Sequence, residues 1–368
     1  MPNNSNWCPD IYRNLFIDKH NNDCVRVAPC CQADSAVEPA ETFDFVTSPS
    51  LTWYRQQFDL NLRPSGCSRC WDLEDFGLRS RRQSVIEFYN LPAEDRIVVL
   101  EGIDHSVTWA CNLACIMCSP FSSSLWATEL KTSAQELRQI GRSFPKYNSY
   151  LDQLDLTSIK KLHFNGGEPL LNNEHLNLMT KLAKQANFND VVLSYNTNGT
   201  TRPSEKVVDM WSQAKSVRIY FSIDATDAAF NYIRFPGRWD EVSSNMLAMR
   251  DSMPSNVMFG INATVGCYNV FEIVDVKNWF NNNLFTNREG DLSDFSWQIS
   301  NGYYIKHLSE RAIIAATEYI NTTPGLSELA AHIQSKHEPS DSWITKLDQI
   351  DKRRGTDWRS TLRIGQYY

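Results

Sequence analysis

Strand-like apolar runs alternate with helix-like segments from about residue 96 to residue 299, and this alternation limits the folds open to the chain. Six strands are predicted, at residues 96–103, 160–164, 191–195, 217–223, 257–265 and 295–299. Strands that alternate with helices pair in parallel through right-handed crossovers. Six such units predict an α/β fold, a partial (β/α)6 TIM-like barrel.

The segments on either side of this repeat have other patterns. Residues 1–92 form short, polar, turn-rich elements, including a predicted β-hairpin, and hold six of the ten cysteines. Residues 303–368 have the pattern of helices. We therefore expect a cysteine-rich N-terminal domain at 1–92, the barrel at 93–302 and a helical C-terminal extension at 303–368.

Charge and hydropathy limit which classes of partner and which cellular compartment we expect. The net charge is −7 and the basic residues are scattered, so nucleic acid is not an expected partner. No apolar run approaches 18 residues, and residues 1–10 lack the pattern of a signal peptide. We expect a cytoplasmic protein with no membrane partner. Its cysteines are then metal ligands or free thiols rather than disulfides.

Three cysteines, Cys111, Cys115 and Cys118, lie within eight residues just after the first predicted barrel strand. Thiolates are soft ligands that suit iron–sulfur clusters and zinc. Structural zinc sites usually close with four protein ligands, so three thiolates favour a site that takes an exogenous ligand. Zinc with a distant fourth ligand, or three unligated thiols, are the alternatives.

The spacing C-x-x-x-C-x-x-C at this position resembles the signature of the radical S-adenosylmethionine (SAM) superfamily. The resemblance implies a [4Fe–4S] cluster on Cys111, Cys115 and Cys118 whose fourth iron chelates SAM. One electron from the cluster then cleaves SAM to a 5′-deoxyadenosyl radical, which removes hydrogen from a substrate. Many members carry an aromatic residue just before the third cysteine. Here Met117 takes that place, and we expect its backbone to contact adenine.

Polar motifs follow the later strands and also resemble family motifs. The segment Gly166-Gly167-Glu168 resembles the GGE motif that holds the SAM amino group, although an ordinary glycine turn has the same composition. By the same resemblance we expect SAM contacts from Asn196, Asn198, Ser222, Thr264 and Val265.

Three further residues have two interpretations each. Arg234 resembles a family arginine that pairs with the SAM carboxylate, or it forms a surface salt bridge. Asp224 reaches the substrate as a catalytic residue, or caps the next helix. Cys267 lies just beyond the fifth strand, where a thiol can donate hydrogen to a substrate radical, or it is a small buried hydrophobe.

The N-terminal cysteines predict a second site. Cys67 and Cys70 form a tight two-ligand clip, and Cys8 and Cys30 can complete a set of four thiolates. Zinc and an iron–sulfur cluster both suit such a set. The arrangement resembles the twitch/SPASM group of radical SAM enzymes, which implies an auxiliary [4Fe–4S] cluster. In place of Cys30, the first substitute is Cys31 and the second is Cys24.

Together these features predict a radical SAM oxidoreductase that modifies a peptide or protein side chain, assisted by the auxiliary cluster. Flavodoxin or ferredoxin is the expected kind of reductant. A small-molecule substrate such as a sugar, nucleotide or amino acid is the alternative. A zinc-binding interaction module is a third hypothesis, but it leaves Gly166-Gly167-Glu168 unexplained.

Overall fold

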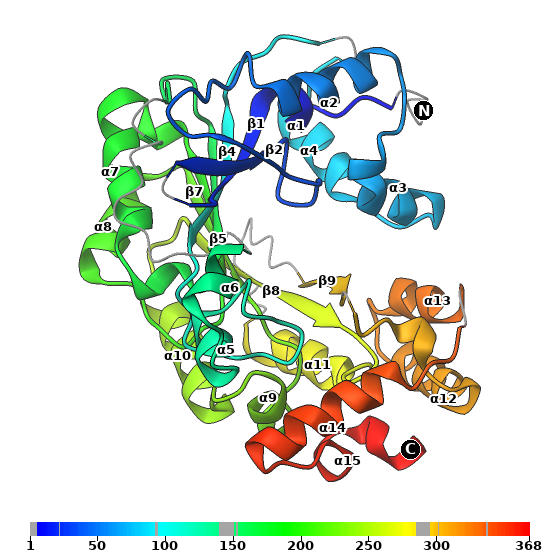
Figure 1. Cartoon of the computed structure of the whole chain (residues 1–368). Coiled ribbons are helices and arrows are strands. Elements are labelled where there is room, and N and C mark those ends of the chain that lie inside the picture. Colours follow the sequence, from blue (N-terminus) through cyan, green and yellow to red (C-terminus); the bar gives the residue numbers. More distant parts are fainter. Residues whose placement is uncertain are drawn as a thin grey trace. The chain divides into compact units, whose positions relative to one another are not determined.

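One mostly parallel sheet organises the computed structural model of the chain (Figure 1). The structure describes residues 6–21, 23–92, 95–139, 151, 154–284, 295–300, 302–335 and 338–368. Within this part of the chain, nine strands follow the order β3-β2-β1-β4-β5-β6-β7-β8-β9. The predicted α/β fold class, with a partial barrel and a helical C-terminal extension, is confirmed.

The strand bounds agree with the sequence pattern for most of the barrel. The strands are β1 (Asn14–Lys19), β2 (Cys24–Ala28), β3 (Ala36–Pro39), β4 (Gly102–Thr108), β5 (Lys161–Gly166), β6 (Val192–Thr197), β7 (Ser216–Phe221), β8 (Val257–Val265) and β9 (Phe295–Ile299). Five of the six predicted strands overlap β5 to β9. Period-two burial in β5, β6 and β7 explains why these runs were recognisable.

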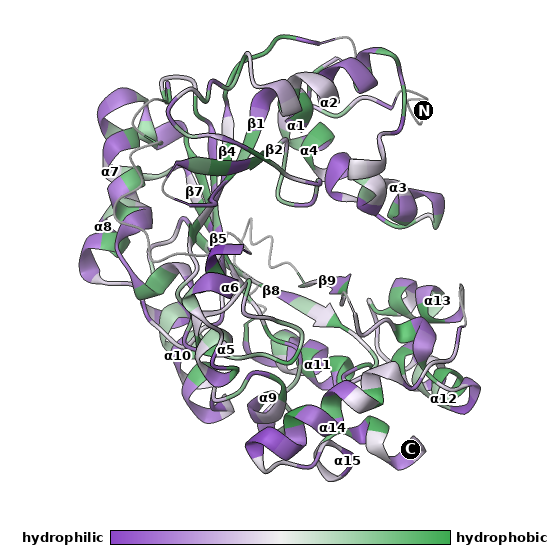
Figure 2. Cartoon of the chain, in the orientation of Figure 1, coloured by the Kyte–Doolittle hydropathy of each residue, from purple (hydrophilic) through white to green (hydrophobic). Residues whose placement is uncertain are grey.

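Most helices between the strands present one apolar face. The described helices are α1 (Asp10–Arg13), α2 (Pro49–Asp59), α3 (Ser68–Asp75), α4 (Arg81–Tyr89), α5 (Ser124–Glu129), α6 (Ala134–Gln139), α7 (Glu174–Gln185), α8 (Glu205–Gln213), α9 (Asp227–Ile233), α10 (Trp239–Ser252), α11 (Ile273–Asn283), α12 (Glu310–Asn321), α13 (Ser327–Ser335), α14 (Ser342–Arg354) and α15 (Trp358–Thr361). In α10, Trp239, Val242, Met246 and Met249 are buried, as expected of a helix packed on one side. Figure 2 shows hydrophilic and hydrophobic residues on the same helices.

The chain divides into two compact units, of which the first comprises Met1–Trp109, Thr132–Ser194 and Asp209–Val217. The predicted hairpin is confirmed, because β1 and β2 pair antiparallel. β3 extends it on one side, and β1 pairs in parallel with β4 on the other. The N-terminal strands thus continue the barrel sheet, a feature that the sequence analysis did not predict. The three-domain division proposed above stays a prediction.

The first barrel strand was predicted wrongly at residues 96–103. β4 is Gly102–Thr108, and the preceding apolar run is irregular backbone, in which Val99 N–H donates to the Tyr12 carbonyl at 3.1 Å. The prediction ended the strand before Asp104, because a carboxylate is rarely buried, whereas Asp104 is buried within β4. Its charge is compensated by Arg81, whose Nη2 lies 2.8 Å from Asp104 Oδ2.

The second unit comprises Ala110–Lys131, Tyr195–Val208 and Arg218–Tyr368. It holds β8, β9 and helices α9 to α15, with the C-terminal helices α12 to α15 drawn from orange to red in Figure 1. Ser309 caps α12 by accepting a hydrogen bond from Ala312 N–H. Trp343 and Trp358, both fully buried, pack with ring centroids 5.3 Å apart and anchor α14 and α15. Among the described helices, none has the length and apolar composition needed to cross a bilayer.

Candidate active site and auxiliary cysteine site

The loop that carries Cys111, Cys115 and Cys118 is fixed by backbone hydrogen bonds to the segment after α9. Ala114 N–H donates to the Phe235 carbonyl at 2.6 Å, and Ile116 N–H donates to the Ile233 carbonyl at 2.9 Å. Within the loop, Cys118 N–H donates to the Cys115 carbonyl at 2.9 Å. The loop is therefore held by contacts distant in sequence and not by its own turn alone.

Helix α5 holds the same loop from its other side. Trp126 Nε1 donates to the Cys115 carbonyl at 2.7 Å, and Ser123 Oγ donates to the Leu113 carbonyl at 2.6 Å. Ser124 Oγ accepts a hydrogen bond from Cys111 N–H at 3.1 Å. Three residues that open α5 thus satisfy loop groups that burial would otherwise leave unpaired.

The three thiols of the trio interact with one another electrostatically. A hydrogen bond with Cys118 lowers the pKa of Cys115, and the Arg234 guanidinium acts in the same direction. The same hydrogen bond, together with burial, raises the pKa of Cys118, which also interacts electrostatically with Cys111. A set of three interacting thiols beside a fixed cation fits an anionic iron–sulfur cluster.

Asp224 and Arg234 form a buried ion pair at this site. Arg234 Nη2 lies 2.7 Å from Asp224 Oδ2, with side chains 8% and 0% exposed. Arg234 Nη1 also lies 3.9 Å from Cys115 Sγ, and Asp224 Oδ1 accepts from Thr264 N–H at 2.6 Å. Burial raises the pKa of Asp224 and Arg234 opposes that rise. Arg234 does form a salt bridge, but in the interior rather than at the surface.

Asn198 links the turn after β6 to the cysteine loop. Its Nδ2 lies 3.0 Å from Asn112 Oδ1 and 4.0 Å from Cys111 Sγ, while its Oδ1 accepts from Thr200 N–H at 2.9 Å. Asn196 is half-buried in β6, two residues earlier. Ser222 is also half-buried, and its N–H donates to the Thr197 carbonyl at 2.8 Å. The structure therefore brings Asn198 to the cysteines.

The remaining predicted SAM contacts of the second unit are positioned by β8 and the cysteine loop. Thr264 is half-buried and Val265 is fully buried near the end of β8. Met117 is half-buried beside Cys118. Cys267 is fully buried, and its thiol donates to the Tyr304 carbonyl at 2.7 Å. Burial raises the pKa of Cys267, an environment that fits the small-hydrophobe interpretation.

The Gly166-Gly167-Glu168 segment ends β5 in the first unit. Gly166 has φ +124°, and a Cβ there would clash with the Thr108 carbonyl oxygen. Gly167 N–H donates to that same carbonyl at 2.6 Å. Glu168 is fully buried, and its Oε1 accepts from Leu170 N–H at 3.1 Å. Glycine is thus required by geometry at Gly166, which distinguishes this segment from a freely variable turn.

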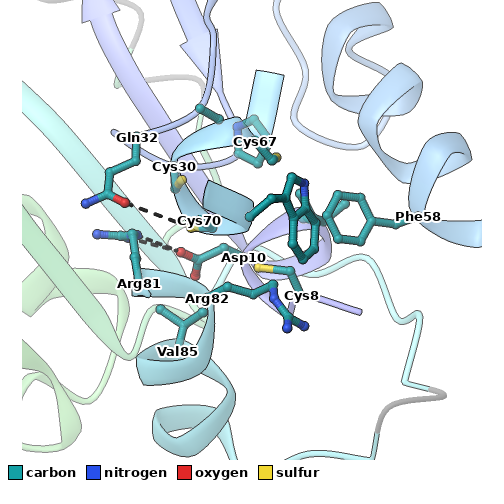
Figure 3. Close-up of a pocket in the computed structure, with 14 residues that line it drawn as sticks. Cys8, Asp10, Cys30, Gln32, Phe58, Cys67, Cys70, Arg81, Arg82 and Val85 are labelled. Atoms are coloured by element: carbon teal, nitrogen blue, oxygen red, sulfur yellow. Dashed lines mark hydrogen bonds and ion pairs between the residues drawn. The ribbon is translucent and has the colours of Figure 1, made fainter. Parts of the chain in front are cut away.

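A second cysteine site lies wholly within the first unit. Cys8, Cys30, Cys67 and Cys70, the four predicted auxiliary ligands, all line one pocket. Figure 3 shows them around the pocket with Arg81, Arg82 and Phe58. The set comes from three separate chain segments. A buried aromatic cluster that includes Trp7, Tyr12, Phe58 and Trp71 packs around Cys8.

Electrostatics at this pocket differ from those at the trio. Burial raises the pKa of Cys8 and Cys67, and it raises the pKa of Cys30 to about 12. The thiols of Cys8, Cys30 and Cys67 each interact electrostatically with Cys70. Four cysteines in one buried pocket provide the ligand type and number of an iron–sulfur cluster, although they do not lie close enough together to hold a single metal ion.

Arg81 lines this pocket together with Arg82, and it was not among the predicted site residues. Its Nη2 lies 3.0 Å from Asp10 Oδ2, and its Nη1 lies 3.5 Å from Cys31 Sγ. Cys31 therefore contacts Arg81 and is not among the pocket-lining residues, nor is Cys24, which lies on β2. The only signal for Arg81 was the short basic run at residues 79–82, which has no distinctive spacing.

Among the residues that the structure describes, no three His, Cys, Asp or Glu side chains lie close enough together to hold a single metal ion.

Residues 106–269 match the family model of the Radical SAM superfamily. The chain carries a radical SAM domain. The matched range includes the cysteine trio, the Gly166-Gly167-Glu168 segment, the Asp224–Arg234 pair and Cys267. The N-terminal cysteine pocket and the C-terminal helices lie outside it. No curated protein matches the chain.

Several solved structures match the chain at low sequence identity. The structure of anSMEcpe with bound AdoMet is 18% identical, covers 60% of this chain and 59% of its own, and has a TM-score of 0.39. The structure of Streptococcus suis SuiB is 13% identical, and the match covers 83% of this chain and 67% of SuiB with a TM-score of 0.37. The structure of SuiB bound to precursor peptide SuiA is 12% identical, and the match covers 91% of this chain and 75% of SuiB with a TM-score of 0.36. The chain spans about three fifths of the length of anSMEcpe.

Proposed function

We propose that the protein is an enzyme whose radical SAM domain cleaves SAM reductively and removes a hydrogen atom from a substrate. The observation that carries this proposal is the set of three interacting thiols, Cys111, Cys115 and Cys118, on one fixed loop of that domain. When bound, a [4Fe–4S] cluster and SAM supply the one-electron cleavage and the radical that abstracts hydrogen.

The chain's own residues bind and orient these groups. Cys111, Cys115 and Cys118 hold the cluster, and Arg234 compensates the thiolate charge at Cys115. Asp224 fixes the Arg234 guanidinium, since the two are paired in the interior. Asn198 donates toward Cys111, and hydrogen bonds to ligand sulfurs tune a cluster's potential.

The SAM contacts remain those that the motifs predict. Glu168 accepts from the SAM amino group, and Gly166 and Gly167 allow backbone to approach it closely. The backbone of Met117 and the side chains of Asn196, Ser222, Thr264 and Val265 complete the set. Cys267 is left out of the proposed chemistry because its buried thiol is bonded to the Tyr304 carbonyl.

In this proposal, Cys8, Cys30, Cys67 and Cys70 of the four-thiol pocket would hold an auxiliary [4Fe–4S] cluster. Such a cluster can accept one electron from a substrate radical, which makes the net reaction oxidative. By resemblance to the auxiliary-cluster group, the substrate is a peptide or protein side chain. Flavodoxin or ferredoxin is the proposed reductant, and the cytoplasm the proposed compartment.

Anaerobic reconstitution tests the chemistry directly. Two clusters give about eight irons per chain, and dithionite with SAM should yield 5′-deoxyadenosine. A colourless protein that contains zinc and no iron would reject the proposal in favour of a zinc-binding module.

A second assay tests the substrate class. 5′-Deoxyadenosine formation is measured with a pool of synthetic peptides and, separately, with a pool of sugars, nucleotides and amino acids. Stimulation by the peptide pool alone supports a peptide substrate. Stimulation by the small-molecule pool alone would overturn that part of the proposal and leave the SAM chemistry in place.

A further inference from the structure

Arg354, the last residue of α14, is a buried cation next to the cysteine loop. Its side chain is 3% exposed. Its Nη2 donates to the Ala114 carbonyl at 2.7 Å. Ala114 lies between Cys111 and Cys115 in the loop. A residue of the C-terminal extension therefore bonds directly to the backbone that carries the cluster thiols.

The same guanidinium is held on several sides. Its Nε and Nη2 lie 3.1 and 3.0 Å from the two carboxylate oxygens of Glu129, the last residue of α5. This two-point geometry is the strong form of an arginine–carboxylate pair. The guanidinium carbon also lies 4.8 Å from the Trp126 ring centroid and 4.5 Å from that of Phe235.

Those two aromatic residues are themselves partners of the loop. Trp126 Nε1 donates to the Cys115 carbonyl, and the Phe235 carbonyl accepts from Ala114 N–H. Arg354 thus contacts the loop itself, at the Ala114 carbonyl, and also both segments that fix the loop. These segments are α5, through Glu129 and Trp126, and the segment after α9, through Phe235.

The end of α14 is rigidly placed, so it can serve as a support. Trp343, Leu347 and Ile350 are buried along one face of the helix. Gly355 ends the helix in the left-handed conformation, and Asp351 Oδ2 accepts from Trp358 N–H at 2.8 Å. The position of Arg354 therefore follows from the packing of the whole extension.

We propose that Arg354 is a positioning residue through which the C-terminal extension holds the cysteine loop in its cluster-binding conformation. The extension is then part of the cluster site and not only a cover for the domain. This inference rests on the proposed function, because it takes Cys111, Cys115 and Cys118 as cluster ligands.

The neighbouring Arg353 provides a matched control. It also approaches Glu129, with Nη1 3.4 Å from Oε1, and its guanidinium carbon lies 5.7 Å from the Trp126 centroid. Its side chain is 34% exposed, and the bond to the Ala114 carbonyl belongs to Arg354. Arg353→Gln therefore removes a cation from the same place without removing the loop contact.

The first measurement is hydrogen exchange of the purified full-length chain before reconstitution. Arg354→Gln should raise exchange of the amides at residues 114–118 and leave β8 unchanged, while Arg353→Gln should leave both unchanged. Equal protection of residues 114–118 in wild type and Arg354→Gln would overturn the inference. Because no cluster is needed, this result is independent of the proposed function.

The second measurement is iron loss to a chelator after reconstitution, with the SAM-responsive signal in electron paramagnetic resonance used to identify the trio's cluster. Loss of a residue that orients a ligand costs about 10- to 100-fold in metal affinity, so Arg354→Gln should weaken retention by that factor. Arg354→Lys should restore part of it. Should Arg354→Gln fail to fold, Glu129→Gln replaces it, with the same expected direction. Retention like that of wild type would overturn the inference. A wild-type protein without a SAM-responsive cluster would instead reject the proposed function.

Discussion

The two cysteine sites differ in how the chain builds them. Three thiols, at 111, 115 and 118, come from eight consecutive residues on one loop. The four thiols of the N-terminal pocket come from three segments separated by tens of residues. Both sites have a cation: Arg234 lies close to Cys115 at the first, and Arg81 interacts with Cys30 at the second, where Asp10 also interacts with Cys8.

This difference bears on what each site can do. A site with three ligands leaves one metal position for an exogenous group, whereas four ligands close the site. At the trio, the hydrogen bond between Cys115 and Cys118 lowers the pKa of Cys115 and raises that of Cys118, while at the pocket burial raises the pKa of Cys8, Cys30 and Cys67. We therefore expect SAM to react at the trio and the pocket to exchange electrons only.

Cys115→Ala provides the strongest test of this contrast. Removing one of three ligands should abolish 5′-deoxyadenosine formation and leave about four of about eight irons, those of the auxiliary cluster. Iron analysis and chromatography of the SAM products measure both effects. Retained SAM cleavage would show that the trio is not the reactive site.

Cys67→Ala should have the complementary effect at the pocket. Iron should again fall to about four per chain, but SAM cleavage in the absence of substrate should persist. Cys31→Ala is the matched control, because Cys31 contacts Arg81 outside the pocket lining. If Cys31→Ala loses iron and Cys67→Ala does not, the proposed ligand set is wrong.

Asp224→Asn should destabilise the fold at the trio. It leaves the buried Arg234 without its carboxylate, and breaking a buried pair costs about 3–5 kcal/mol. Asp240→Asn is the control, because its pair with Arg238 is 65% and 62% exposed and should contribute nothing measurable. Urea unfolding of both variants measures the difference. Equal midpoints would mean that the Asp224–Arg234 pair is not structurally important.

Gly166→Ala should lower the free energy of unfolding by less than Asp224→Asn does. It tests the predicted SAM motif. A residue with a side chain in an unfavourable backbone region costs about 1–3 kcal/mol, and the new Cβ would also meet the Thr108 carbonyl oxygen. Gly77→Ala is matched, with φ +74° but no atom within 4 Å of the added Cβ. Thermal unfolding should rank Gly166→Ala as the less stable variant. SAM affinity should fall only for Gly166→Ala.

Much of the barrel was predictable because its signals are local. Period-two burial marked β5 to β7, and the spacing of Cys111, Cys115 and Cys118 marked them as one set of candidate ligands. The first strand was misplaced because the buried charge of Asp104 is neutralised by Arg81, 23 positions earlier in the chain. Nothing within the strand itself indicates that compensation.

The sequence by itself determined the strand–helix alternation, the cysteine trio and the glycine-rich motif, since each depends on residues a few positions apart. Only the tertiary structure decided that Cys30 rather than Cys31 lines the pocket, and that Arg354 bonds to the cysteine loop. The physical reason is range: spacing within one element fixes which side chains share a face. Contacts between distant segments depend on how buried surfaces pack, and no local pattern records that packing.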